Sequence, residues 1–256
     1  MKRFLNISLS ILLVATLAFL LGYVYHRHIN QPVKKVIIHI ARASDKGFLD
    51  ARELTSVLEP ITQKKTLIKN IRYDSIEEIL LKNPWIMEAD VFTNIEGDLM
   101  VNIREQEPVL RIFPSNSKGF YLDGKGNIIP LNDRYSPRVM VANGYIKFYP
   151  IKGHQNIYDT IYHDKTLPHL LNVTRQINRF PFLKSLIGEI YLNSKGELDI
   201  VPAYGSQVIH LGNDKALTRK LENLAVFYKK ALPYESRLQY KSLNLKYNDQ
   251  IICTKN

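Results

Sequence analysis

The chain has 256 residues and a formal net charge of +11 at pH 7, from 35 Lys and Arg residues against 24 Asp and Glu residues. The basic residues are spread along the chain without a block of five or more like charges, which indicates a solvated surface and argues against nucleic-acid binding. The excess charge could still attract anionic lipid or an acidic protein partner. The single cysteine, Cys253, excludes an intramolecular disulfide, so we expect stability to come from hydrophobic cores.

An uncharged apolar run from Phe4 to Tyr25 is the first element, and basic residues flank it on both sides. As a helix its 22 residues would be about 33 Å long, enough to cross a hydrocarbon core of about 30 Å. The run therefore predicts a transmembrane helix over residues 4–25. A cytoplasmic tail of residues 1–3 would precede it, and a polar tether over residues 26–33 would follow.

A cleaved signal peptide is the alternative interpretation, because Thr16-Leu17-Ala18 forms a weak cleavage pattern of small residues. The apolar run continues to Val24, however, and this length favours an uncleaved anchor. The positive-inside count is nearly tied between the two flanks. Since the N-terminal flank is so short, we expect a single-pass type II protein with its bulk outside the cytoplasm.

The first strand and helix of the soluble part follow the tether. Val36–Ile40 is typical of a strand. Asp50 and Glu53 then form the capping box of a helix, which we expect to end at Pro60.

A second helix is predicted where Ser75-Ile76-Glu77-Glu78 repeats the capping box. Its apolar residues Ile76, Ile79 and Leu80 are spaced for one face. We expect this helix to stop at Asn83-Pro84, because the residue before proline disfavours the helical conformation.

A hairpin completes this region, with strands over Trp85–Asn94 and Leu99–Glu105 and a turn at Glu96-Gly97-Asp98. The resulting order is strand, helix, helix, strand, strand. It predicts a three-stranded sheet covered on one face by two helices, over residues 34–107.

The remaining residues, 108–256, have the pattern of an antiparallel β domain with two supporting helices. The predicted elements are strands at Val109–Phe113, Leu186–Leu192, Leu198–Val201 and Gln207–Leu211, a hairpin within Gly119–Leu131, a helix at Leu167–Phe180 that ends at Pro181, and a helix beginning near Asn213 or Asp214.

The segment Asp123-Gly124-Lys125-Gly126-Asn127 has two possible interpretations. A calcium loop would need six or more oxygen ligands and several acidic residues, but only Asp123 is acidic here. We therefore expect a tight hairpin turn in which the glycines supply positive φ angles.

The last apolar pattern, over Ser242–Cys253, predicts a strand. Leu243, Leu245, Tyr247, Ile251 and Cys253 alternate with polar residues, and Asp249 breaks the apolar face as a bulge or turn would. A strand at the end of the chain is expected at the edge of its sheet, where unpaired N–H and C=O groups invite strand addition by another chain.

Several of these segments resemble the FtsQ/DivIB family of bacterial cell-division proteins. Asn83–Val91 resembles the step that leads into the hairpin of that family's POTRA domain, and Arg104–Pro108 resembles its "ERxP" element with one extra residue. Gly119–Leu131 is similar to the family's "YLVD" hairpin, and Ser242–Cys253 to its closing strand. The resemblance covers nearly the whole chain.

The resemblance implies an α+β protein with one transmembrane helix, a POTRA domain and a β domain. It implies a place in the bacterial inner membrane at the division septum, with the bulk of the chain in the periplasm. Its function would be that of a non-enzymatic scaffold that binds the single-pass proteins FtsB and FtsL by strand addition and links early and late division proteins.

The same resemblance implies that the last strand carries the partner-binding residues. These are Lys246, Tyr247, Asp249, Gln250 and Ile251. We expect no catalytic residue, metal, cofactor or small-molecule substrate, because the sequence contains neither a phosphate-binding glycine loop nor a metal-ligand spacing.

A sortase-type enzyme and a POTRA docking protein are the two other functions that the sequence suggests. A sortase-type enzyme would need an activated cysteine and a later arginine, but only three residues follow Cys253, which is also in phase with Leu243 and Leu245. The alternative function is a membrane-anchored POTRA protein that docks or chaperones exported polypeptides. Its working surface would be an exposed edge strand of the POTRA domain.

Overall fold

The structure is a computed structural model that describes residues 2–42, 44–63, 65–151, 155–231, 240–247 and 250–255. Its contacts divide the chain into two compact units, Met1–Glu105 and Gln106–Asn256. Each unit buries its own cluster of hydrophobic side chains. The expected α+β class is confirmed.

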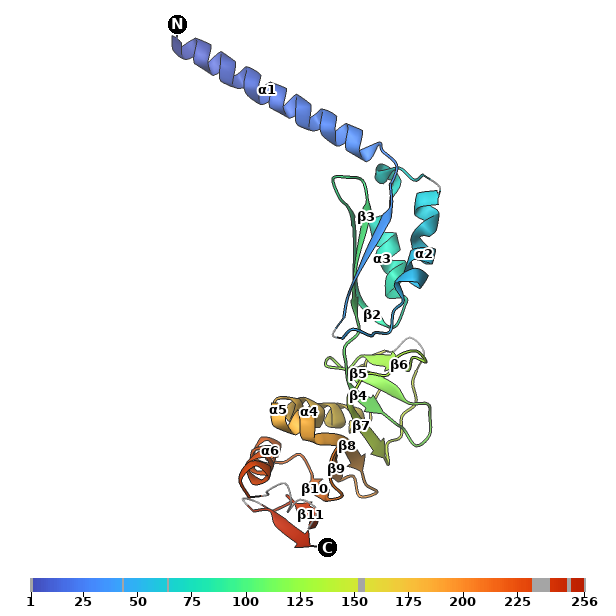
Figure 1. Cartoon of the computed structure of the whole chain (residues 1–256), viewed down its shortest axis with the longest axis vertical. Coiled ribbons are helices and arrows are strands. Elements are labelled where there is room, and N and C mark those ends of the chain that lie inside the picture. The colour runs from blue at the N-terminus through green and yellow to red at the C-terminus, as the bar shows by residue number, and fades with distance from the viewer. Residues whose placement is uncertain are drawn as a thin grey trace. The chain divides into compact units, whose positions relative to one another are not determined.

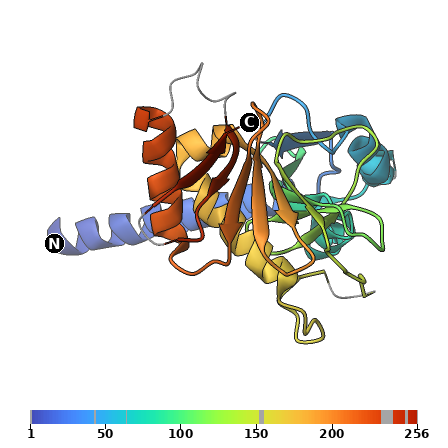
Figure 2. The ribbon, with the colours of Figure 1, turned by 90° about the horizontal axis from the view of Figure 1, so that it is seen from below.

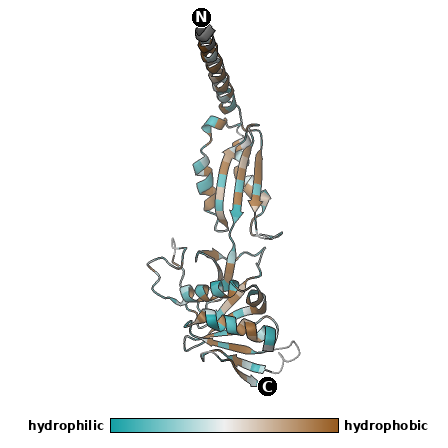
Figure 3. Ribbon diagram, turned by 90° about the vertical axis from the view of Figure 1, so that its left-hand side faces the viewer, coloured by the Kyte–Doolittle hydropathy of each residue, from teal (hydrophilic) through white to brown (hydrophobic). Residues whose placement is uncertain are grey.

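The first unit begins with helix α1, Lys2–Ile29, of which Ile7–Ile29 is long and apolar enough to cross a membrane. Figure 3 shows α1 as hydrophobic along most of its length. Its apolar side chains from Ile7 to Tyr25 are exposed, so none of them packs into a core formed by the residues that the structure describes. The helix continues past Tyr25, and residues 26–29 of the expected tether are therefore helical.

The rest of the first unit is a three-stranded sheet with two helices. Its elements are β1 (Val36–Ala41), α2 (Ala51–Gln63), a short 3-10 helix η1 (Ile68–Asn70), α3 (Tyr73–Leu81), β2 (Ile86–Thr93) and β3 (Leu99–Glu105). The strand order is β1-β3-β2, with β1 parallel and β2 antiparallel to β3. Both helices lie on the same side of the sheet, as predicted (Figure 1).

The pleat of β3 explains this one-sided packing. Leu99, Val101 and Ile103 are buried against the helices, whereas Arg104 is exposed. Glu105 lies on the same buried face but is charged, unlike the apolar residues before it. Its carboxylate accepts hydrogen bonds from the backbone N–H groups of Phe48 and Leu49, at 3.2 and 3.0 Å. A buried charge is tolerated here because these donors replace its water.

Three details of the helix predictions were wrong. Helix α2 does not end at Pro60 but continues to Gln63, and Ile61 packs against the core from this last turn. Helix α3 begins at Tyr73, so Ser75 lies inside it and does not cap it. Ile79 is 52% exposed and does not share the buried face of α3. Tertiary packing decides these boundaries over local propensity.

The second unit is one nine-stranded sheet with helices packed on it. Its elements are β4 (Pro108–Ile112), β5 (Phe120–Asp123), β6 (Ile128–Pro130), β7 (Met140–Gly144), α4 (Thr166–Asn178), α5 (Pro181–Leu186), β8 (Ile187–Leu192), β9 (Leu198–Pro202), β10 (Val208–Gly212), α6 (Leu217–Val226), the π-helical turn η2 (Phe227–Ala231), β11 (Tyr240–Asn244) and β12 (Ile252–Lys255). The strand order is β12-β11-β10-β9-β8-β7-β4-β5-β6.

The expectation of a purely antiparallel sheet was wrong, because the sheet is mixed. The pairs β4–β7, β7–β8 and β10–β11 are parallel. Parallel neighbours need a crossover connection, which α4 and α5 provide between β7 and β8, and α6 between β10 and β11. Pro181 does end α4, but it also starts α5 from its first turn, where a missing N–H costs nothing.

Helices α4, α5 and α6 cover one face of this sheet. Figures 1 and 2 show them on one side of the strands. Leu170, Leu171 and Ile177 of α4 are fully buried, as are Ile190 and Ile200 of the central strands. This continuous core keeps the late strands, β10 and β11, in a fixed register.

The Asp123–Asn127 segment forms the expected hairpin turn. The Asp123 carboxylate accepts hydrogen bonds from the backbone N–H groups of Lys125 and Asn127, both at 2.7 Å, and from the Asn127 side-chain amide at 2.7 Å. Gly126 has a φ of +91°, but Gly124 does not have a positive φ, so only one of the two glycines has the expected conformation. The carboxylate oxygens are thus engaged by the turn itself.

Replacing Asp123 by Ala should destabilise the protein by about 1–3 kcal/mol, since the donors on Lys125 and Asn127 lose a charged, buried acceptor. Thermal and urea unfolding of the full chain would measure this loss, with the exposed Asp133→Ala as the matched control. Adding calcium or a chelator should leave the unfolding of the unsubstituted chain unchanged. A calcium-dependent rise in melting temperature would contradict the turn assignment.

Candidate partner-binding edge

The predicted closing strand, Ser242–Cys253, is two strands joined by a reversal of the chain. β12 runs antiparallel to β11, and Leu243 lies opposite Cys253. The single-strand prediction was therefore wrong. The Asn244 side chain accepts a hydrogen bond from the backbone N–H of Lys246 at 3.0 Å, and such a local bond favours a turn over a continued ladder.

β12 is the edge strand of the nine-stranded sheet, with β11 as its neighbour. Alternate backbone N–H and C=O groups of an edge strand point away from the sheet and are available to another chain. Its side chains are mostly at the surface, since Ile252 is 45% exposed and Cys253 is partly buried. The edge expected from the position of this segment in the chain is therefore present.

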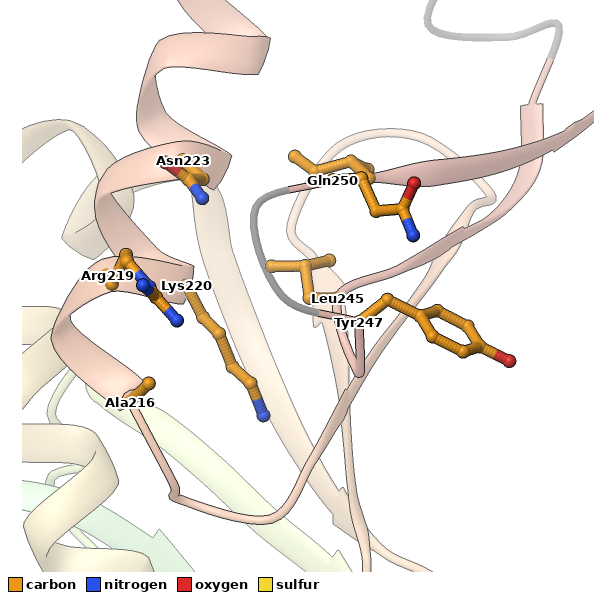
Figure 4. Close-up of a pocket in the computed structure, with 8 residues that line it drawn as sticks. Ala216, Arg219, Lys220, Asn223, Leu245, Tyr247 and Gln250 are labelled. Atoms are coloured by element: carbon orange, nitrogen blue, oxygen red, sulfur yellow. The ribbon is translucent and has the colours of Figure 1, made fainter.

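The predicted binding residues lie beside β12, in the turn that precedes it. Tyr247 is 53% exposed, and Figure 4 shows its ring pointing away from α6. Gln250 is exposed, and Ile251 packs partly against the core. Lys246 is also in this turn, and Asp249 lies outside the described residues. Four of the five predicted residues thus gather around one reversal of the chain.

Helix α6 forms the other wall of a small pocket beside this turn (Figure 4). Ala216, Arg219, Lys220 and Asn223 face Leu245, Tyr247, Gln250 and Ile251 across it. The sequence analysis missed the α6 residues. Their signal was present, because Arg219 and Asn223 are one helical turn apart and lie off the apolar stripe of α6.

Lys220 is held by the backbone at the start of α6. Its ammonium donates hydrogen bonds to the carbonyl oxygens of Leu211 and Asn213, both at 2.9 Å. Partial burial lowers the pKa of Lys220, Asp214 opposes this shift, and the charge of Lys246 adds to it. Lys220 therefore fixes the β10–α6 turn and adds positive charge beside the pocket.

Lys246 has a partner within its own chain. Its ammonium lies 2.6 Å from the Glu197 carboxylate, and this hydrogen bond holds the pKa of Glu197 below its ordinary value. The side-chain stem passes Gly212, whose φ is +74° and where an added Cβ would lie 2.9 Å from the Lys246 Cγ. The ion pair fixes the start of the turn that presents Tyr247.

The C-terminal segment that carries the edge is basic. The described residues from 213 onward include eight Lys or Arg residues and two Asp or Glu residues. The basic ones are Lys215, Arg219, Lys220, Lys229, Lys230, Lys241, Lys246 and Lys255. A surface of this sign attracts an acidic partner segment and raises the rate of encounter.

The environment of Cys253 opposes a catalytic role for its thiol. Burial raises the pKa of Cys253, whereas a nucleophile needs a lowered one. Its sulfur lies 3.8 Å from the carbonyl oxygen of Ile251. Among the described residues no group of three or more His, Cys, Asp or Glu side chains is placed to hold a metal ion.

Comparison with known proteins gives matches over both units. The family model described as "FtsQ/DivIB, C-terminal related" matches residues 107–254, and the model of a POTRA-like domain matches residues 31–104. The chain is also similar to the cell division protein FtsQ of Geotalea daltonii, with 27% identity over 187 residues. That match covers 72% of this chain and 64% of the length of the relative.

Replacing Lys246 by Met should raise the pKa of Glu197 toward its ordinary value, because the carboxylate loses its charged donor. Since the pKa is lowered in the folded state, the contribution of the pair to stability is present above pH about 4.3 and is lost as the pH falls through the lowered value. Carboxyl NMR titration would measure the shift. Lys195→Met is the control and should move Glu197 less, because its coulombic effect is the smaller one.

Proposed function

Because this chain belongs to the FtsQ/DivIB family, we propose that it is a non-enzymatic scaffold of bacterial cell division. In this proposal it binds the FtsB and FtsL proteins through its second unit and links early and late components of the division machinery. The observation that carries the proposal is the edge strand β12, which lies beside an exposed tyrosine and a basic helix. No step of this function requires a cofactor or a substrate.

Strand addition is the mode of binding that this edge favours. A partner segment in extended form would pair with the outward-pointing backbone groups of β12, which supply affinity without regard to sequence. Tyr247 and Ile252 would then give apolar contact on either side of the turn. A large exposed aromatic ring is the kind of residue that most often dominates binding energy at an interface.

The positive charge near β12 indicates which kind of partner segment would bind there. Arg219 projects from α6 beside the turn, and Lys255 ends β12. A partner whose docking segment carries acidic residues would match this charge, and its association rate would fall as salt screens the field. The partner segment would therefore combine an extended stretch with acidic residues next to it.

The membrane location follows the same reasoning. An N-terminal apolar helix fits a single-pass membrane protein. We place the chain in the inner membrane at the septum, with α1 in the bilayer and the POTRA-like domain and the second unit in the periplasm. There, single-pass partners anchored in the same membrane would meet β12 at a high local concentration.

A second candidate function, docking of exported polypeptides by the POTRA-like domain, has one observation in its favour. The sheet of the first unit ends at β1, and an open hollow beside this strand is lined by Ile38, Ile40, Ala41, Arg42, Ser44, Asp45 and Ala51. An extended polypeptide could pair with β1 there. In that case, changes in β12 should have no effect on binding.

Proline substitutions along β12 test strand addition directly. Successive backbone N–H groups of β12 point alternately toward β11 and away from the sheet. Of the two variants Cys253→Pro and Thr254→Pro, one should therefore lose a hydrogen bond to β11 and be less stable. The other should lose only an N–H group that points away from the sheet. We expect the variant that keeps its melting temperature to lose binding of purified FtsB–FtsL to the full chain in nanodiscs. Unchanged binding by that variant would contradict strand addition at β12.

Replacing Tyr247 by Ala should weaken FtsB–FtsL binding by roughly tenfold or more, because an exposed aromatic anchor is lost. Stability should hardly change, since the ring is 53% exposed. The control is Tyr204→Ala, which removes a 78% exposed tyrosine elsewhere in the same unit. Calorimetry at two salt concentrations would measure both affinities. Equal effects of the two substitutions would argue against a docking role for Tyr247.

A further inference from the structure

We propose that one end of the POTRA-like domain rests on the lipid bilayer that anchors α1, with Ile95 inserted at the headgroup level. We name this end the lipid-facing tip and define it as residues 30–35, 65–70 and 94–99. The inference goes beyond partner binding and concerns the first unit alone. It starts from an exposed side chain that the domain core does not explain.

Ile95 lies in the turn between β2 and β3 and is 89% exposed, more than any other large hydrophobic side chain that the structure describes. An isolated exposed hydrophobic residue is common on protein surfaces and needs no special account. The location of this one is what sets it apart. The turn is bonded to the chain just after the membrane-spanning segment.

The chain between α1 and β1 is not a free tether. Ile68 donates a backbone hydrogen bond to Gln31 at 3.1 Å, and Val33 donates one to Thr66 at 3.0 Å. Lys34 donates to the carbonyl oxygen of Gly97 at 3.0 Å. The loops around η1 and around the β2–β3 turn are thus held to residues that directly follow Ile29.

Side chains reinforce these backbone bonds. The Lys69 ammonium donates to the Asn30 side-chain oxygen at 2.6 Å, and Lys35 forms an ion pair with Asp98 at 3.6 Å. The Gln31 side chain packs on Gly97, where an added Cβ would lie 2.8 Å from the Gln31 Nε2. Glycine is favoured at this position because its φ is +88°, and its lack of a side chain leaves room for Gln31.

These bonds limit how far the tip can be from the membrane. Lys34 is five residues beyond the end of the Ile7–Ile29 span, so its bond to Gly97 lies within about 18 Å of that end even for an extended chain. Gln31 is two residues beyond it, which is about 7 Å. The headgroup region is itself several ångströms thick, so the Gln31 bond lies in or next to it, and the Lys34 bond lies close enough for the tip to reach the bilayer surface.

The charge of the tip matches a lipid surface. It carries four lysines, Lys34, Lys35, Lys65 and Lys69, all exposed, against two acidic residues, Glu96 and Asp98. Asp98 is buried and paired with Lys35, so the accessible charge is mainly positive. Lysines at the same end of a domain as an exposed apolar side chain are typical of a shallow interfacial anchor, in which the lysines reach anionic headgroups.

Spin labelling of the full chain in nanodiscs tests this contact. In a Cys253→Ser background, a nitroxide at Ile95→Cys would be compared with one at Leu81→Cys, an exposed site at the end of α3, ahead of the start of β2. The measured quantity is the ratio of the accessibility of each label to oxygen, which concentrates in lipid, to its accessibility to a water-soluble nickel chelate. We expect this ratio to be several-fold higher at residue 95 than at residue 81. Adding phosphatidylglycerol to phosphatidylcholine should increase this difference, and Lys34→Gln with Lys69→Gln should reduce it.

Equal accessibility of both labels to the nickel chelate would overturn the proposal. Protection of residue 95 that arises only after FtsB–FtsL is added would also overturn it, by assigning the tip to a protein partner. Ile95→Asp should abolish insertion of the tip while FtsB–FtsL binding remains. Insertion that persists in Ile95→Asp would overturn the proposal. Failure of the chain labelled at residue 95 to bind FtsB–FtsL, with its label inserted, would count against the proposed function alone.

Discussion

The parallel pairing of β11 with β10 is the constraint on which the proposed binding edge depends. A parallel neighbour cannot follow through a tight turn, so the chain has to cross the sheet through α6 before β11 begins. The crossover brings α6 beside the turn that leads to β12, and it leaves β12 as the outermost strand. Edge, turn and basic helix are therefore produced by one connection.

The ion pair between Lys246 and Glu197 fixes the position of the chain where the turn between β11 and β12 begins. Glu197 precedes β9, and Lys246 follows β11, so the pair joins segments 49 residues apart in the sequence. An exposed pair of this kind adds little to stability. Its effect is to hold the start of the turn in place. Lys246, one of the predicted binding residues, thus already has a partner within the chain.

The sequence pattern predicted the first unit well because its signals are local. Alternation over Leu99–Glu105 and the Asp50 cap each act within a few residues, and both are confirmed by β3 and by the Asp50–Arg52 hydrogen bond at 2.8 Å. Parallel pairing in the second unit has no local signal, because strands such as β7 and β8 meet only through the intervening helices. The split between β11 and β12 was missed for another reason. Apolar alternation continues through Leu245 and Tyr247, so the interruption at Asp249 did not indicate that the strand ends at Asn244.

The parallel contact between β1 and β3 has a mechanical consequence. The chain enters this domain from α1 at the start of β1 and leaves it toward the second unit at the end of β3. Tension between a membrane anchor and a bound partner would thus pull two neighbouring strands in opposite directions along their length. The six residue pairs from Val36–Leu99 to Ala41–Arg104 would share that load in shear and would not open one after another. The parallel pairing of β1 with β3 would therefore resist a pulling force applied between the two ends of the domain.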